Sequence, residues 1–162
     1  MAQSGFWWQR YGTLAQMAQA GVALLGVIAI MLQVEEIRSN NRATSARQAF
    51  LGYTDLAFKN PKFSLPDYEA IKAAGRNERE QYESFVSYFL YACEETIAAF
   101  ADKREWRASC DYELKPHLPF LCERGAVEPA FLDTYGPETR QWIRASLKAA
   151  SVAPPECKPG KT

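Results

Sequence analysis

The first 34 residues contain one ionisable side chain, Arg10, and no acidic residue, and this feature constrains the fold most. The 21 residues from Leu14 to Val34 carry no charge. As an α-helix they reach about 31 Å, close to the thickness of the hydrocarbon core of a bilayer. Their unbroken apolar part, Ala20 to Leu32, has 13 residues. The pattern predicts a transmembrane helix over residues 14–34, preceded by a short extracytoplasmic tail over residues 1–13.

Aromatic and basic residues flank the uncharged run. Trp7, Trp8 and Tyr11 lie before it, where amphipathic rings favour the headgroup layer, and Arg38 and Arg42 follow it. We predict that these five residues lie at the membrane interface. A buried core helix of a soluble protein stays open as an alternative, because a short apolar run suits that role as well. A cleaved secretory signal is disfavoured, because no small-x-small cleavage site follows the apolar run.

Basic residues predict the orientation of the span, since they are enriched in the cytoplasmic segments of membrane proteins. Arg10 and the amino group precede the uncharged run, whereas Arg38, Arg42 and Arg47 follow it. Neighbouring acidic residues count little in this rule and do not cancel the arginines. The sequence therefore predicts a single-pass protein of the bacterial inner membrane, with residues 35–162 in the cytoplasm.

Small residues recur within the predicted span. Ala20, Ala23, Gly26 and Ala29 would allow a second helix to approach closely. No strict small-xxx-small pair dominates the run. A helix–helix contact and ordinary use of small residues in a membrane helix stay open as equal alternatives.

Helical patterns continue beyond the span. No proline interrupts residues 35–59, and charged side chains lie three and four residues apart, which supports a helix in water. We predict one continuous helix from about Thr13 to Lys59, with residues 35–60 forming a stalk that joins the core. The helix is expected to end there because Asn60 precedes a proline, which disfavours the α conformation.

Residues 61–150 are predicted to form an all-α cytosolic helical domain. Its longest helix is expected from about Glu78 to Ala101, with Asn77 as its N-cap. The short helix before it is expected to have Ser64 as its N-cap. Its core-facing residues lie at steps of three and four: Tyr82, Phe85, Val86, Phe89, Cys93, Ile97 and Phe100. No alternating strand pattern of useful length is present, and the proline-rich residues 151–162 are expected to be disordered.

Composition and motifs argue against several classes of function. The 19 basic residues are balanced by 19 acidic residues, so the chain lacks the positive excess that binding to nucleic acid requires. The sequence has no C-x-x-C pair, no glycine-rich phosphate loop and no G-x-S-x-G motif. We therefore expect no catalytic residue, metal site, cofactor, nucleic acid or small-molecule substrate.

The cysteines, the single histidine and a pair of acids remain as candidates for chemistry. In a cytoplasmic setting all four cysteines are expected to be thiols, and Cys93 is interpreted as a small buried hydrophobe. As a catalytic base, His117 would need a nearby cysteine and an orienting group, so a surface or capping role is favoured. Glu94 and Glu95 are expected to pair with Arg or Lys of another helix or to face water.

The layout resembles widespread bacterial single-pass proteins of unknown function. The residues that carry this likeness are a membrane helix running into Glu35-Glu36-Ile37-Arg38-Ser39-Asn40, then Asn60-Pro61, Phe89, Glu94-Glu95, Trp106, Phe131-Leu132-Asp133, Tyr135 and Trp142-Ile143. The layout is also similar to membrane accessory proteins of RNA-targeting CRISPR systems, which assemble into ring-like pores. Some relatives of such domains carry an RNA-cleaving Arg-x4–6-His pattern. The chain departs from it, because Cys110, Asp111 and Tyr112 stand where the arginine would be.

These observations favour a non-enzymatic, membrane-anchored helical protein that contacts the lipid bilayer and a protein partner or further copies of itself. An accessory subunit of a larger membrane assembly is a related possibility, and the CRISPR likeness would make it defence-related. The alternative from a different class is a membrane-anchored hydrolase or nuclease that uses His117.

Overall fold

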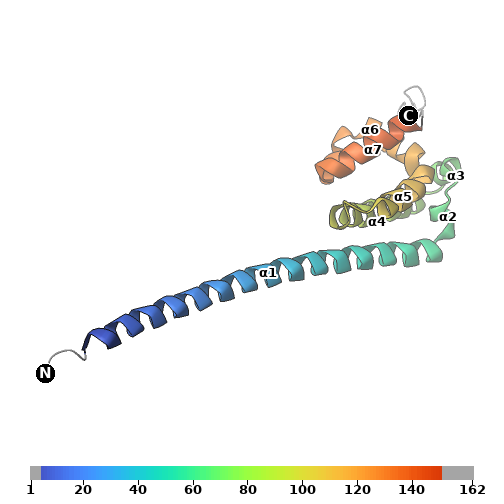
Figure 1. Ribbon diagram of the computed structural model, residues 1–162. Helices are drawn as coiled ribbons and strands as arrows, with labels where there is room; N and C mark the ends of the chain where they lie inside the picture. The colour runs from blue at the N-terminus through green and yellow to red at the C-terminus, as the bar shows by residue number, and fades with distance from the viewer. Residues whose placement is uncertain (1–4, 151–162) are drawn as a thin grey trace. The chain divides into compact units, whose positions relative to one another are not determined.

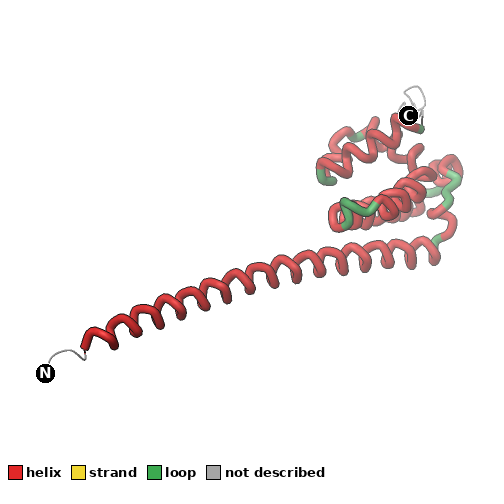
Figure 2. The backbone as a smooth tube through the Cα atoms, in the orientation of Figure 1, coloured by secondary structure: helices red, strands yellow, loops and turns green. Residues whose placement is uncertain are grey.

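The computed structural model describes residues 5–150, with side chains from residue 16 onward except those of Val127 and Pro129. Every regular element among these residues is a helix, so the predicted all-α class is confirmed (Figures 1 and 2). In chain order the elements are α1 (Gly5–Lys59), α2 (Pro61–Ser64), α3 (Tyr68–Ala73), α4 (Arg76–Ala99), α5 (Arg104–Leu114), the 3-10 helix η1 (Lys115–His117), α6 (Leu118–Val127), the 3-10 helix η2 (Pro129–Thr134) and α7 (Pro137–Ala149). The predicted disorder of residues 151–162 lies outside the described residues.

The chain divides into two compact units, and α1 contributes to both. The first unit, Met1–Asn41, is called the anchor below, and the second, Arg42–Thr162, is called the helical domain. The last part of α1 therefore belongs to the domain. Its residues Ala46 and Tyr53 are buried within the domain.

The long helix α1 begins earlier than predicted and ends where predicted. It starts at Gly5 rather than near Thr13, because no proline breaks the preceding residues. At its end, the backbone N–H and the side-chain amide of Asn60 both donate to the carbonyl of Leu56, at 3.0 and 2.9 Å. Asn60 thus closes the last turn, and the following proline prevents a further one.

Both predicted N-caps are wrong. Ser64 ends α2, and its hydroxyl donates to the carbonyl of Ala57 at 3.1 Å. Asp67 caps α3 instead, by accepting the backbone N–H of Ala70 at 3.1 Å. Gly75 precedes α4 without a side-chain cap, and Asn77 lies inside that helix. Several cap-forming residues compete in this stretch, and the backbone path selects among them.

The core of the helical domain is organised around α4, and the predicted stripe on this helix is confirmed. All seven residues of the stripe are buried. Tyr53 of α1 packs its ring against Phe85 and Phe89, with centroids 5.7 and 5.0 Å apart. Gly52 allows Tyr88 to lie directly against α1, because a Cβ at this position would collide with the tyrosine hydroxyl. The inward face of α1 and the predicted face of α4 therefore form one core.

A disulfide joins α4 to α5 and corrects the expectation of free thiols. Cys93 and Cys110 are fully buried, with Cα atoms 5.9 Å apart and a sequence separation of 17. Cys122 also has no free thiol. Cysteine spacing did not reveal this pairing, because the two residues meet only when α5 folds back along α4.

Candidate functional site

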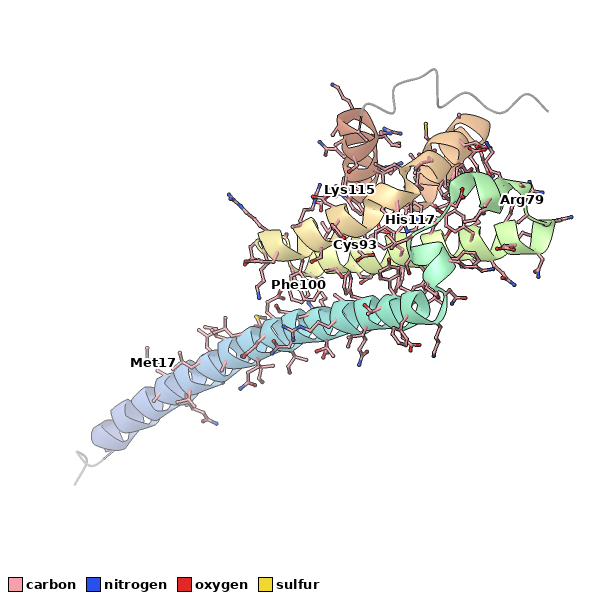
Figure 3. The ribbon with its side chains drawn as sticks, turned by 90° about the vertical axis from the view of Figure 1, so that its right-hand side faces the viewer. Met17, Arg79, Cys93, Phe100, Lys115 and His117 are labelled. Carbon is pink, nitrogen blue, oxygen red and sulfur yellow. A yellow bond between two sulfur atoms is a disulfide. The ribbon has the colours of Figure 1, made fainter. Side chains whose placement is uncertain are left out.

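The anchor contains a helix long and apolar enough to cross a membrane. Over Gln16–Lys59, the most apolar window has a mean hydropathy of 2.0, and none of that window is buried. A core helix of a soluble protein would bury its apolar residues against other elements. Here Leu24, Leu25 and Met31 are more than 60% exposed, which is consistent with contact to lipid. Met17, labelled in Figure 3, is another exposed apolar residue of this helix.

The other predicted membrane residues divide into described and undescribed positions. Arg38 and Arg42 are exposed on α1. The side chains of Trp7, Trp8 and Tyr11 lie outside the described residues. The small residues Ala20, Ala23, Gly26 and Ala29 are exposed, and nothing lies within 4 Å of a Cβ built at Gly26. This surface has the space that a second helix would need.

The helical domain also exposes large apolar side chains on α1. Leu51 is 66% exposed and Phe58 is 87% exposed. They lie seven residues apart, so they occupy neighbouring positions on one side of the helix. The same helix buries Ala46 and Tyr53 on its other side. This pair therefore forms an unpartnered apolar stripe outside the domain core.

His117 lies in the core rather than at the surface. It occupies the N-cap position of α6, but its side chain makes no capping hydrogen bond. It is fully buried, and its Nδ1 is 2.9 Å from the hydroxyl of Tyr82 (Figure 3). The rings of Phe85 and Phe89 lie 5.8 and 5.6 Å from the imidazole. Nε2 has no hydrogen-bond partner. Burial lowers the pKa of His117 to about 4, so the ring is neutral at physiological pH.

This environment argues against the use of His117 as a catalytic base. A base must reach the proton that it removes from the substrate, and His117 has no exposed surface. Cys110, which could have served as a nucleophile nearby, is bonded to Cys93. The imidazole instead fills an aromatic core, with the hydroxyl of Tyr82 as its polar contact.

Glu94 binds the start of α7 rather than a basic side chain. Its Oε1 accepts the backbone N–H of Gly136, the residue that precedes α7, at 2.5 Å. A carboxylate at a helix N-terminus satisfies a backbone donor and interacts favourably with the helix dipole. Of the two adjacent acids, Glu94 thus stabilises the fold through this hydrogen bond to α7.

One pocket of the helical domain combines aromatic walls with charged residues. It has a volume of about 330 Å³ and lies between α3, the first half of α4, and α6. The rings of Tyr68, Tyr82 and Phe120 contact one another, with centroid separations of 5.3–6.3 Å. The charged residues that line it are Lys72, Arg76, Arg79, Glu80, Glu83, Glu123 and Arg124.

The sequence did not reveal this pocket. Its residues come from three helices, and no short motif joins them. Two of its ion pairs, Lys72–Glu123 and Arg124–Glu83, join different helices and therefore depend on the tertiary structure.

Comparisons with protein-family models, with curated proteins and with solved structures find no match to this chain. The likeness to bacterial single-pass proteins and to CRISPR accessory proteins therefore stays a prediction from the sequence.

Proposed function

We propose that this chain is a single-pass membrane protein of the bacterial inner membrane, whose helical domain associates with a second copy of itself. The candidate membrane helix in the anchor supports the first part of this proposal. The exposed stripe of Leu51 and Phe58 supports the second part and is the observation that carries it. Large apolar side chains that remain this exposed on an otherwise packed domain commonly mark an interaction surface.

The spacing of apolar residues favours a second copy as the occupant of this stripe. Within the anchor, Ile30 and Ile37 are exposed and seven residues apart, and Ala23 lies at the same heptad position. The polar residue Thr44 occupies the next place at this heptad position, and the apolar residues Leu51 and Phe58 occupy the two places after it, within the domain. Two copies that cross one membrane in the same direction bring identical helices together in parallel. A heptad pattern is the arrangement that parallel helices bury against each other.

The association is tested on the full-length protein in detergent, by light scattering coupled to size-exclusion chromatography. We expect the mass of two chains for the wild type and of one chain for the double variant Leu51→Glu/Phe58→Glu. Both side chains are exposed, so the substitutions leave the core of the monomer intact. The matched control is Tyr112→Glu, which places the same charge on another exposed aromatic residue, 70% exposed on α5. A monomeric wild type, or a double variant that still dimerises, would refute the proposal.

Two observations favour opposite sides of the membrane for the helical domain. The three arginines after the span favour the cytoplasm. The disulfide between Cys93 and Cys110 favours an oxidising compartment, because cytoplasmic reductants keep protein thiols reduced. The arginine rule is a statistical bias, and long domains cross the membrane largely regardless of their charge. We therefore propose that the domain lies on the periplasmic side, the reverse of the orientation predicted from the arginines.

Sidedness is tested with a thiol reagent that does not cross membranes. We expect a Tyr112→Cys variant to be labelled in intact spheroplasts, because this position is well exposed on the domain. A Ser4→Cys variant, on the other side of the span, is expected to be labelled only after permeabilisation. The opposite labelling pattern would show that the domain lies in the cytoplasm.

The hydrolase or nuclease alternative gains no support from the described residues. His117 is buried in an aromatic core, and the cysteine closest to it in sequence on α5, Cys110, is in a disulfide. Full biological activity of a folded His117→Asn variant would dispose of this alternative.

A further inference from the structure

Cys122 of α6 takes part in a disulfide, and the cysteines of the chain indicate its partner. The chain has four cysteines, and Cys122 is disulfide-bonded. Cys93 and Cys110 are bonded to each other, so neither is available to Cys122. Within one chain, Cys157 is therefore the remaining cysteine with which Cys122 can pair. Cys157 itself lies outside the residues that the structure describes.

The end of α7 lies close enough to α6 for this pairing. Leu118 of α6 lines the same surface pocket as Ala149 and Ala150 at the end of α7. Cys122 follows Leu118 by one helical turn, so both residues lie on the same side of α6. Seven peptide units separate Ala150 from Cys157, and they reach about 25 Å when fully extended. The chain after α7 is therefore long enough to return to Cys122.

The surroundings of Cys122 suit a structural disulfide rather than a catalytic one. The side chain is 6% exposed. Exchange of a disulfide requires that a thiolate reach one of its two sulfur atoms. Burial therefore protects the bond from exchange at the Cys122 sulfur.

We infer that a second disulfide, between Cys122 and Cys157, fastens the C-terminal segment of the chain to α6. The loop that this bond closes contains η2 and all of α7. Glu94 already holds the residue before the first turn of α7, and the bond adds a link beyond its last turn. A crosslink of this kind stabilises a fold by limiting the conformations of the unfolded chain.

Formation of this bond is an oxidation and needs an electron acceptor. The two thiols lose two protons and two electrons, and their sulfur atoms join. The protons and electrons pass to the disulfide of a thiol oxidant, which is reduced to a dithiol. The bacterial periplasm is kept oxidising by such oxidants, whereas the cytoplasm keeps thiols reduced. The inference therefore rests on the proposed periplasmic location of the helical domain.

The test is mass spectrometry of the full-length protein, purified in detergent from cells whose free thiols are blocked with N-ethylmaleimide before lysis. Digestion with trypsin and Glu-C without reductant places each of the four cysteines on a separate peptide. We expect peptide 114–123, with Cys122, to be linked to peptide 157–161, with Cys157. The two peptides should separate after reduction.

Counting thiols in the unfolded protein gives a second measurement. Without reductant, the wild type is expected to have no thiol that reacts with a maleimide. Cys157→Ser is expected to have one, because Cys122 loses its partner. Glu156→Ser is the matched control, since it alters the neighbouring residue and should have none.

The outcomes distinguish this inference from the proposed location of the domain. Peptide 114–123 linked to a second copy of itself would overturn the inference. A blocked thiol at Cys122 beside an intact Cys93–Cys110 bond, or no thiol in Cys157→Ser, would also overturn it. These results would leave the proposed location standing. Blocked thiols at all four cysteines would overturn both.

Discussion

Burial changes the protonation behaviour of His117. Its ring is enclosed by Tyr82, Phe85 and Phe89, and it contacts one polar group, the Tyr82 hydroxyl. Protonation would place a charge in this apolar environment, which is why burial lowers the pKa to about 4. The unfolded chain returns the ring to water and to an ordinary pKa of about 6.5. When the pH is low enough to protonate His117 in the unfolded chain but not in the folded chain, the unfolded state is favoured and the protein loses stability.

The free energy of unfolding is expected to fall as the pH is lowered from about 6.5 toward 4. Between these values the unfolded state binds more protons at this site, so stability rises with pH and is lost on acidification. By pH 4 the loss amounts to about 3 kcal/mol. The measurement is urea unfolding of the full-length protein in detergent at several pH values, followed by tryptophan fluorescence.

The control for this prediction is His117→Asn, which keeps a side-chain group able to hydrogen-bond Tyr82 but does not titrate. Carboxylates titrate in both proteins, so the difference between the two pH profiles isolates His117. If the two profiles are parallel between pH 7 and pH 4, the predicted contribution of His117 is absent.

At the scale of single helices, contacts between distant helices replace several local signals. The start of α7 is capped by Glu94 of α4, 42 positions earlier in the chain. The indole N–H of Trp142 on α7 donates to Asp111 of α5 at 2.5 Å. Each contact provides a carboxylate acceptor from another helix for an N–H group at or on α7. The position of α7 therefore depends on polar groups of α4 and α5 as well as on apolar burial.

Substitution Glu94→Ala is expected to lower the free energy of unfolding by about 1 kcal/mol. It leaves the part-buried N–H of Gly136 without an acceptor and removes a negative charge from the N-terminus of α7. The matched control is Glu95→Ala on the same helix, which should change stability by less than about 0.5 kcal/mol. Equal effects of the two substitutions in thermal unfolding would contradict this role of Glu94.

The link between α4 and α5 gives a second prediction at this scale. Loss of the disulfide in Cys93→Ala/Cys110→Ala is expected to lower the free energy of unfolding by about 3 kcal/mol, because the bond closes a loop between cysteines 17 positions apart. Dithiothreitol should destabilise the wild type by at least as much. A wild type whose unfolding is unaffected by the reductant would restore the prediction of free thiols.

At the scale of the whole molecule, the anchor contains the candidate membrane span. Its apolar side chains are exposed over the candidate span, and their removal from water requires lipid or another protein. The domain buries its own core and leaves the Leu51–Phe58 stripe uncovered. The proposed membrane attachment and the proposed association can be tested separately, because Leu51 and Phe58 lie outside the uncharged run of residues 14–34.

The substitution Ile28→Arg is expected to weaken membrane insertion. A charged side chain at the centre of a span costs about 2.5–3.5 kcal/mol on insertion scales, and this span is short. After lysis and high-speed centrifugation without detergent, the wild type should sediment with the membranes and the variant should appear partly in the supernatant. The control Ile28→Leu should sediment like the wild type. A wild type that stays in the supernatant would remove the basis for the membrane proposals.

The sequence alone determined those features that depend on local chemistry. The uncharged run identified the candidate membrane helix, the proline at position 61 ended α1, and the apolar spacing on α4 identified the face that the core buries. Each of these follows from side chains a few residues apart on one helix. Helical periodicity and the exclusion of charge from lipid require no knowledge of the fold.

Only the tertiary structure decided which distant residues meet. It paired Cys93 with Cys110, placed His117 among aromatic rings, and brought Glu94 to the start of α7. These contacts join residues of different helices, and their geometry depends on how the chain reverses between the helices. The residue pattern along one helix does not specify how the chain turns between helices. The sequence therefore predicted several helices but not the contacts between them.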